Sequence, residues 1–220
     1  SDLFPSLERA VTGAALAREA GATACELLDR TFLDVARSAQ ALPVPDDTEA
    51  VLLIELEGDG ATGESVAARA QALARACEAN GATGALVGLD AESEESLWAL
   101  RHAASPILAR LDPNLKSMQI VEDGCVPPER LGDYVRGVRD ALAASRFRGV
   151  IFGHAGDAHV HVNALVDVRE DDWRDRVRLL FHNVVALTSA LGGTVAGEHG
   201  DGRLRTPVLG QLWPAGALAL

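Results

Sequence analysis

The chain has almost no lysine, few cysteines and no long hydrophobic run. No apolar run approaches the roughly 18 residues that a membrane-spanning helix needs, and no signal peptide is recognisable, so we expect a cytoplasmic protein. The three cysteines, Cys25, Cys77 and Cys125, stand far apart. This spacing excludes a disulfide framework and a cysteine cluster for zinc or iron–sulfur within the chain, and predicts small buried thiols instead.

Basic residues are few, and all but one of them are arginine. The formal net charge is −12, so we expect no nucleic-acid partner, and an anionic substrate would need a local basic pocket. Of the 20 basic residues only Lys116 is a lysine, which favours a compact ammonium group at that position, although chance retention on a loop explains it equally well. A Walker loop, a nucleophile elbow and a dinucleotide-binding fingerprint are also missing.

Hydrophobic periodicity predicts a mixture of helices and short strands in a chain of 220 residues, long enough for one large domain or two small lobes. Glycines and prolines mark the ends of most of these elements. We expect helices over 7–20, 27–41, 66–79, 94–108, 127–142 and 171–191. We expect extended segments briefly between Gly21 and Leu27, and over 51–56, 84–89, 118–123, 148–152, 159–165 and 193–197.

The stretch from Gly153 to Asn163 holds three histidines around a glycine turn and predicts a β-hairpin. Strand alternation places His159, His161 and Asn163 on one polar face that we expect to be wet. An even-numbered turn would add His154 to that face, and an odd-numbered turn would not. Converging imidazoles are typical of a metal site or a general base, and the alternative is a set of structural histidines.

A second glycine-rich stretch, 193–203, carries the adjacent pair Glu198 and His199. Its glycines allow the backbone to approach a flat ligand closely. Together with the hairpin histidines, the Glu198 carboxylate would complete a His, His, Glu set with an open position, which is the pattern of a catalytic zinc.

The expected helix over 94–108 places Arg101 and Ser105 one turn apart. A guanidinium with a neighbouring hydroxyl is typical of a carboxylate clamp, and the alternative is a solvated helix arginine.

These stretches together resemble the C-terminal domain of the FAD-linked oxidases, a family that includes D-lactate dehydrogenases, the glycolate oxidase flavin subunit and D-2-hydroxyglutarate dehydrogenases. The resemblance covers most of the chain. The residues that carry it are Gly153-His154-Ala155-Gly156-Asp157 through His161-Val162-Asn163, Glu198-His199-Gly200-Asp201-Gly202-Arg203, and more weakly Trp98-Ala99-Leu100-Arg101 and Val121-Glu122-Asp123 through Pro127.

The resemblance implies an α+β fold, with an antiparallel sheet covered by helices in a ferredoxin-like arrangement. Residues 1–220 would then be a truncated C-terminal, substrate-side domain, and its N-terminal flavin-binding domain would be absent from this chain. We therefore expect FAD to be held mainly by that domain and not tightly by this chain alone.

The family also implies roles for individual residues. His154, His161 and Glu198 would bind a divalent metal, with Zn2+ as the expected ion. Arg101, Ser105 and Lys116 would bind the substrate carboxylates, while Asn163 and His199 would face substrate and flavin, with Glu198 and Gly200 also near the cofactor. The departure from the family is Ala158-His159, where many relatives have Gly-Asn, and the extra histidine leaves the ligand set open.

The expected reaction is oxidation of a D-2-hydroxy acid to the 2-oxo acid, with hydride transfer to FAD. Arg101 and Lys116 would anchor the substrate and His199 would accept the hydroxyl proton. Expected partners are the chain's own flavin domain, a small anionic 2-hydroxy acid, and a downstream iron–sulfur module or other electron acceptor. A homodimer and a peripheral association with the inner membrane are further options.

Three other readings stay open at the level of sequence. They are a stand-alone zinc-dependent hydrolase, a non-catalytic module that binds a small carboxylate, and a non-redox flavin transfer reaction like that of alkyl-glycerone-phosphate synthases.

Overall fold

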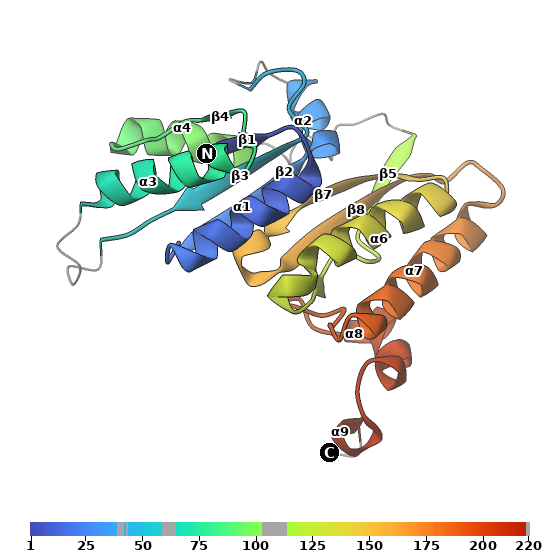
Figure 1. Cartoon of the computed structure of the whole chain (residues 1–220). Helices are drawn as coiled ribbons and strands as arrows, with labels where there is room; N and C mark the ends of the chain where they lie inside the picture. The colour runs from blue at the N-terminus through green and yellow to red at the C-terminus, as the bar shows by residue number, and fades with distance from the viewer. Residues whose placement is uncertain (39–41, 43, 59–64, 103–113, 219–220) are drawn as a thin grey trace. The chain divides into compact units, whose positions relative to one another are not determined.

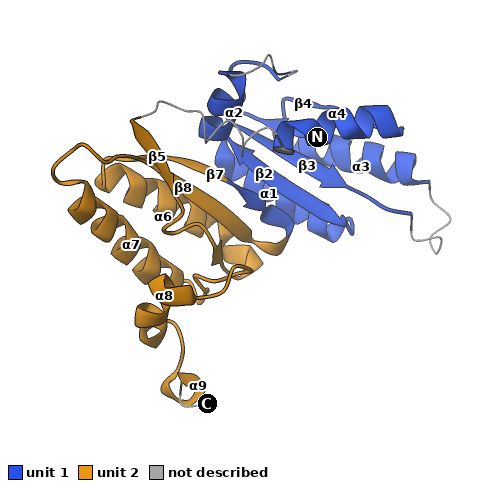
Figure 2. Ribbon diagram, turned by 180° about the vertical axis from the view of Figure 1, so that it is seen from behind, with its two compact units in different colours: residues 1–108, 152–156 blue, residues 109–151, 157–220 orange. Residues whose placement is uncertain are grey.

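A computed structural model of the chain describes residues 1–38, 42, 44–58, 65–102 and 114–218 (Figure 1). The chain divides into two compact units, coloured separately in Figure 2: unit 1 is residues 1–108 and 152–156, and unit 2 is residues 109–151 and 157–220. Among the described helices, none combines the length and the apolar character that crossing a bilayer would require. The fold is α+β, as expected.

Unit 1 is built on a ferredoxin-like sheet in which neighbouring strands run antiparallel. The strand order is β4-β1-β3-β2, and the split βαβ connections of this order place helices between the strands. Helix α1 contacts α3 as well as β2 and β3. The elements are β1 (Asp2–Phe4), α1 (Leu7–Glu19), β2 (Ala24–Asp29), α2 (Arg30–Arg37), β3 (Ala50–Glu55), α3 (Val66–Ala79), β4 (Gly84–Ala85) and α4 (Ala91–His102).

The brief extended segment predicted before Leu27 is confirmed as the first half of strand β2, but the helix predicted over 27–41 is wrong at its start, because the strand continues to Asp29. A short apolar run does not distinguish a buried strand from a helix by periodicity alone. Here Leu27 and Leu28 are both fully buried, and β2 is covered on both edges, by β3 and by the end of β7. The helix begins only after Asp29, whose carboxylate accepts a hydrogen bond of 2.9 Å from the Phe32 backbone N–H. Strand β1 was not predicted, and β4 is shorter than the predicted 84–89.

Unit 2 has a smaller antiparallel sheet and two packed helices. Strand β8 pairs with β5 along one part of its length and with β6 along another, and α6 contacts α7. The elements are β5 (Leu115–Met118), β6 (Gly124–Cys125), η1 (Pro128–Arg130), α6 (Leu131–Ala144), β7 (Arg148–His154), η2 (Ala155–Asp157), β8 (His159–Asp167), α7 (Trp173–Ala190), α8 (Gly202–Arg205), η3 (Thr206–Gln211) and α9 (Ala215–Leu218). By its residues, β7 contributes its first four positions to unit 2 and its last three to unit 1.

Two extended segments of unit 2 differ from prediction. Strand β5 covers 115–118, so the predicted segment over 118–123 is a strand only at its first residue. The predicted strand over 193–197 is reduced to one antiparallel bridge between Thr194 and Cys125. The ends of the two segments contact each other, because the Gly197 N–H donates to the Asp123 carbonyl at 3.0 Å and the next two backbone N–H groups donate to the Asp123 carboxylate.

The hairpin is confirmed, with β7 and β8 separated by η2. The expected wet face of β8 is not wet, because His159, His161 and Asn163 are buried like the valines between them, with only 5–6% of each residue exposed. Buried polar side chains need hydrogen-bond partners, so the histidines of this strand must be satisfied by other buried groups.

Candidate functional site

In unit 2, the buried carboxylate of Asp123 contacts groups from three parts of the chain. Its oxygens accept hydrogen bonds from Nε2 of His159 at 2.7 Å and from the backbone N–H groups of Glu198 and His199 at 3.1 and 3.0 Å. Burial alone would raise the pKa of Asp123, but these hydrogen bonds, together with the charge of Arg205, lower it below the usual value. Asp123 therefore fixes the backbone of the Glu198-His199 pair against β8.

The neighbouring residue, Glu122, holds two imidazoles in different ways. Nδ1 of His199 donates to its carboxylate at 2.8 Å, and Nδ1 of His161 donates to its backbone carbonyl at 2.8 Å. The guanidinium of Arg205, itself buried, pairs with Glu122 and lies 3.3 Å from Asp123. The two adjacent carboxylates thus share one internal cation, which offsets the cost of burying them.

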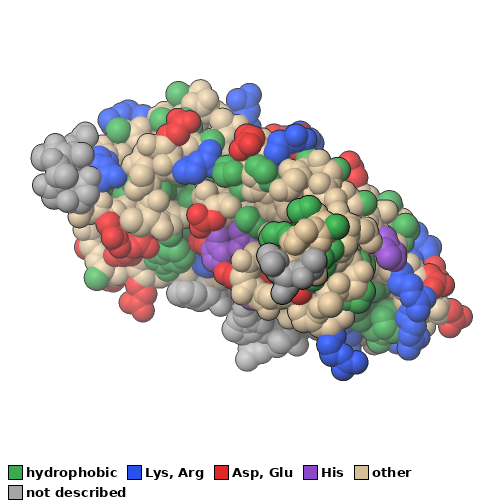
Figure 3. Space-filling model, turned by 90° about the horizontal axis from the view of Figure 1, so that it is seen from below, with side chains coloured by type: hydrophobic (Ala, Val, Ile, Leu, Met, Phe, Trp, Pro, Cys, Tyr) green, Lys and Arg blue, Asp and Glu red, His purple; other side chains and the backbone are tan. Residues whose placement is uncertain are grey.

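Glu198 lies between two imidazoles that face it through the same nitrogen. Its Oε1 is 3.4 Å from Nε2 of His161 and 3.2 Å from Nε2 of His199, and the two rings stack with their centroids 5.4 Å apart. The side chains of Glu198 and His199 are 45% and 47% exposed. On the face drawn in Figure 3, histidine side chains reach the surface with acidic side chains beside them. The hydrogen bond to Glu122 raises the pKa of His199 above its usual value, and nearby carboxylates add to this.

The donors of unit 2 fit a divalent metal. Metal-binding histidines typically give their other ring nitrogen to a carbonyl or carboxylate, and Nδ1 of His161 does so with Glu122, which directs Nε2 toward Glu198. One donor atom each from His159, His161 and Glu198 lies within 4.8 Å of the others. Since His159 uses Nε2 to bind Asp123, a metal contact by this residue would have to use Nδ1.

A second group of donors in unit 2 fits a metal less well. Glu122, Asp123, His161 and His199 also have donor atoms within 4.8 Å of one another. Both carboxylates, however, are already paired with the buried Arg205. A metal would have to compete with that fixed cation, so we interpret this group as a structural network.

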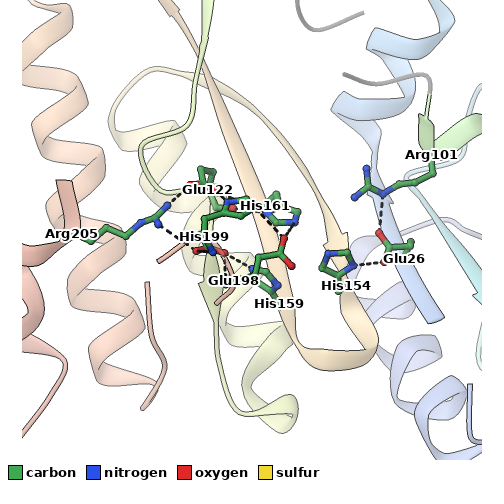
Figure 4. A network of polar contacts seen from close by, with 10 residues as sticks. Glu26, Arg101, Glu122, His154, His159, His161, Glu198, His199 and Arg205 are labelled. Atoms are coloured by element: carbon green, nitrogen blue, oxygen red, sulfur yellow. Dashed lines mark hydrogen bonds and ion pairs between the residues drawn. The ribbon is translucent and has the colours of Figure 1, made fainter. Parts of the chain in front are cut away.

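In unit 1, a single carboxylate, that of Glu26 on β2, contacts two residues that the sequence singled out. Its Oε2 accepts a hydrogen bond of 2.8 Å from Nε of Arg101, and its Oε1 lies 2.5 Å from Nδ1 of His154 (Figure 4). The Arg101 guanidinium also stacks on the ring of Phe152, 4.9 Å from the centroid. Burial alone would raise the pKa of Glu26, but the bonds from His154 and Arg101 lower it.

The remaining predicted residues have separate environments. Ser105 lies outside the described residues. Lys116 is on β5 with an exposed side chain, and Gly200 has a φ of +73°, which favours glycine. Oδ1 of Asn163, on β8, is buried and has no hydrogen-bond partner among the described residues. A buried amide oxygen without a partner is rare and is consistent with a ligand that would supply the missing donor.

Unit 2 therefore brings together His161, Glu198 and His199, and unit 1 places Arg101 and His154 on one carboxylate. Sequence reasoning missed the residues that hold them: Glu26, Asp123 and Arg205 had no assigned role, and Glu122-Asp123 was noted only as part of a weak family pattern. The available signal was a charged residue inside a strongly apolar segment, as with Glu26 between Cys25 and Leu27.

Comparison with known proteins agrees with this architecture. The family model described as "FAD linked oxidases, C-terminal domain" matches residues 3–220, and the chain belongs to this family. The glycolate oxidase subunit GlcD of Bacillus subtilis (strain 168) is 32% identical over 184 residues, covering 84% of the chain and 38% of that protein. The D-2-hydroxyglutarate dehydrogenase of Escherichia coli (strain K12) is 29% identical over 213 residues, covering 90% of the chain and 21% of that protein.

A probable mitochondrial D-lactate dehydrogenase of Danio rerio is 27% identical over 201 residues, covering 90% of the chain and 39% of that protein. The chain thus spans between about a fifth and two fifths of the length of these relatives. The relatives act on different hydroxy acids by name, but they share the domain to which this chain corresponds.

Proposed function

We propose that the protein containing this chain oxidises a D-2-hydroxy acid to the 2-oxo acid, with transfer of hydride to FAD. The observation that carries the proposal is the arrangement in unit 2 of an exposed His199 beside Glu198 and His161, held from behind by Glu122 and Asp123. This arrangement offers a proton acceptor next to a candidate metal ligand set. Membership of the FAD-linked oxidase family and the names of the relatives support the reaction class.

The substrate carboxylate would be bound by Arg101, Lys116 and Ser105. Arg101 is held by Glu26 and Phe152, so its guanidinium is preorganised for an anion. Lys116 would add an ammonium group from an exposed position on β5. Binding the carboxylate would fix the α-carbon and its hydroxyl, which lowers the entropic part of the barrier.

His199 would accept the proton of the α-hydroxyl through its imidazole. The hydrogen bond from its Nδ1 to Glu122 fixes the ring and favours the protonated form that this transfer produces. Because its backbone N–H is bonded to Asp123, the whole residue is anchored rather than only its ring. The 2-oxo product would leave with the same carboxylate contacts.

A divalent metal, zinc in our proposal, would be held by His154, His161 and Glu198, as the family resemblance implies. When bound, such an ion polarises the substrate hydroxyl and lowers the cost of its negative charge. The second-nitrogen contacts of His161 and His154, to Glu122 and Glu26, are those expected of metal-binding imidazoles.

FAD would be held mainly by an N-terminal flavin domain of the same protein, which is its proposed partner. The cofactor supplies the hydride acceptor. From this chain, Asn163, Glu198, His199 and Gly200 would face the flavin or the substrate, and the orphaned Oδ1 of Asn163 fits such a contact.

The direct test is anaerobic mixing of the full-length flavoprotein with single hydroxy acids. We expect D-lactate, glycolate or D-2-hydroxyglutarate to bleach the flavin absorbance, and their L-enantiomers, where they exist, to fail. A flavin-loaded protein that none of a broad panel of 2-hydroxy acids reduces would contradict the proposal. Ester hydrolysis by the zinc-supplemented chain in that case would favour a hydrolase.

A further inference from the structure

We infer that Glu26 is a positioning residue that orients Arg101 and His154 from one carboxylate. The inference rests on the proposed function, because it concerns how the proposed substrate-binding arginine and the proposed metal-binding histidine are held. All three residues belong to unit 1, and all three are described.

Glu26 occupies a position in β2 where an apolar residue would be less costly. Its neighbours Cys25 and Leu27 are buried, and it lies between β3 and the end of β7, opposite Leu53 on one side and His154 on the other. Burying a charged carboxylate in such a strand is unfavourable unless it is paired. Replacing a buried ion pair with apolar residues often stabilises a protein, so a pair of this kind needs a reason other than stability.

The exposed fraction of the side chain increases from Glu26 through Arg101 to His154. Glu26 is 7% exposed, Arg101 is 18% exposed and His154 is 34% exposed. The carboxylate is therefore the deepest member of the group, and the two residues that it contacts are more open to solvent than it is. The order observed is that of a supporting group beneath two groups that meet a ligand.

The contact with His154 selects one ring nitrogen. A carboxylate can only accept a hydrogen bond, so Nδ1 of a neutral His154 carries the proton and Nε2 carries the lone pair. A metal ion binds the nitrogen that has the lone pair. Glu26 therefore assigns Nε2 of His154 as the ligand atom.

The contact with Arg101 selects one edge of the guanidinium. The hydrogen bond uses Nε, and Cζ of the guanidinium lies over the Phe152 ring, 4.9 Å from its centroid. An incoming carboxylate would then be met by the edge formed by the two terminal nitrogens, which is suited to a bidentate contact. One carboxylate thus sets the orientation of both groups.

The decisive variant is Glu26→Gln, because the amide has the same shape but only one acceptor oxygen. If that oxygen stays on Arg101, the amide nitrogen faces His154 and donates to Nδ1, which moves the imidazole proton to Nε2. We expect NMR of the imidazole nitrogens in the chain, at alkaline pH, to report the Nδ1–H tautomer of His154 in the wild type and the Nε2–H tautomer in Glu26→Gln. The same tautomer in both proteins would overturn the inference.

A second readout is zinc affinity by calorimetry. Loss of a group that supports a metal ligand typically weakens metal binding by about 10- to 100-fold, and we expect this for Glu26→Gln. The matched control is Glu49→Gln, which removes the same charge from a more exposed ion pair with Arg30 in the same unit and should leave zinc affinity unchanged. Equal affinities for the wild type and Glu26→Gln would contradict the inference.

If Glu26→Gln does not fold, Glu26→Asp provides a second test. It keeps the charge, but its side chain is one methylene too short to reach both partners. We expect it to weaken zinc binding as well, and wild-type affinity would overturn the inference. The tautomer measurement needs no substrate and no flavin. A wild-type protein that no hydroxy acid reduces would therefore refute the proposed function, while a tautomer that ignores position 26 would refute only this inference.

Discussion

Each unit pairs buried acidic residues with an arginine, but the two arginines differ in how far they are exposed to solvent. In unit 2, Arg205 is 7% exposed and pairs with both Glu122 and Asp123. In unit 1, Arg101 is more exposed and contacts Glu26 through Nε. Arg205 is enclosed by the groups that it neutralises and stabilises the fold. Arg101, in the role that we propose for it, is held by Glu26 and offers its terminal nitrogens to a ligand.

The largest effect should come from removing Arg205. Arg205→Met would leave two buried carboxylates without their cation, and breaking such a pair costs about 3–5 kcal/mol. We expect a loss of this size in the free energy of unfolding measured in urea. Arg203→Met, in the same helix but exposed, is the control and should change stability by less than about 0.5 kcal/mol. A mild effect at position 205 would remove the distinction between the two arginines.

The next effect concerns catalysis in unit 2. His199→Ala removes the proposed proton acceptor, and we expect flavin reduction in the full-length protein to slow by about 100-fold or more. His182→Ala, on α7 of the same unit, is the control and should retain the wild-type rate. Unchanged reduction by His199→Ala would show that the exposed imidazole of unit 2 does not take the proton.

A smaller effect should follow from crowding the Asp123 network. A Cβ atom at position 197 would lie 2.6 Å from Nε2 of His159, the atom that donates to Asp123. Overpacking of this kind typically costs about 1–3 kcal/mol, so Gly197→Ala should be less stable by that amount. Gly210→Ala has open space around its Cβ and serves as the control. Equal melting temperatures for the two variants would argue against a tightly packed network.

The smallest expected effect concerns Asp167, whose low pKa tests whether a lowered carboxyl pKa by itself indicates a functional site. The bonds from Arg169 lower the pKa of Asp167 to about 2, although this carboxylate is on the surface of unit 2. Because the folded pKa is below the unfolded one, the interaction is present above about pH 4 and is lost as the pH falls toward 2. In Arg169→Gln, an NMR titration should return the pKa of Asp167 toward its usual range, with flavin reduction unaffected. Slower reduction would place this pair in the site.

Most of the architecture could be predicted because it depends on local patterns. The hairpin and the helices α3, α6 and α7 follow from periodicity, turn residues and prolines. The second half of strand β2, residues 27–29, could not be separated from a helix, because its burial comes from β3 and β7, which are distant in the sequence. Only the full fold shows which edges are covered.

The supporting residues of the site could not be predicted for the same reason. Glu26 meets Arg101 and His154 across 75 and 128 positions of the chain, and Asp123 meets Arg205 across 82. The sequence identifies imidazoles and guanidiniums that have the right chemistry, but it does not show which carboxylate neutralises which cation. That assignment decides whether an arginine such as Arg101 is available to a ligand.

The most direct test of this account is the substrate concentration dependence of anaerobic flavin reduction in Arg101→Met of the full-length protein. Loss of a charge-assisted contact worth about 1.5–3 kcal/mol should raise the half-saturating concentration of the hydroxy acid by about 10- to 160-fold. Arg205→Met is the comparison variant, because we expect it to lower the free energy of unfolding rather than the affinity for the substrate. Wild-type substrate dependence in Arg101→Met would contradict the claim that unit 1 holds this arginine for the substrate.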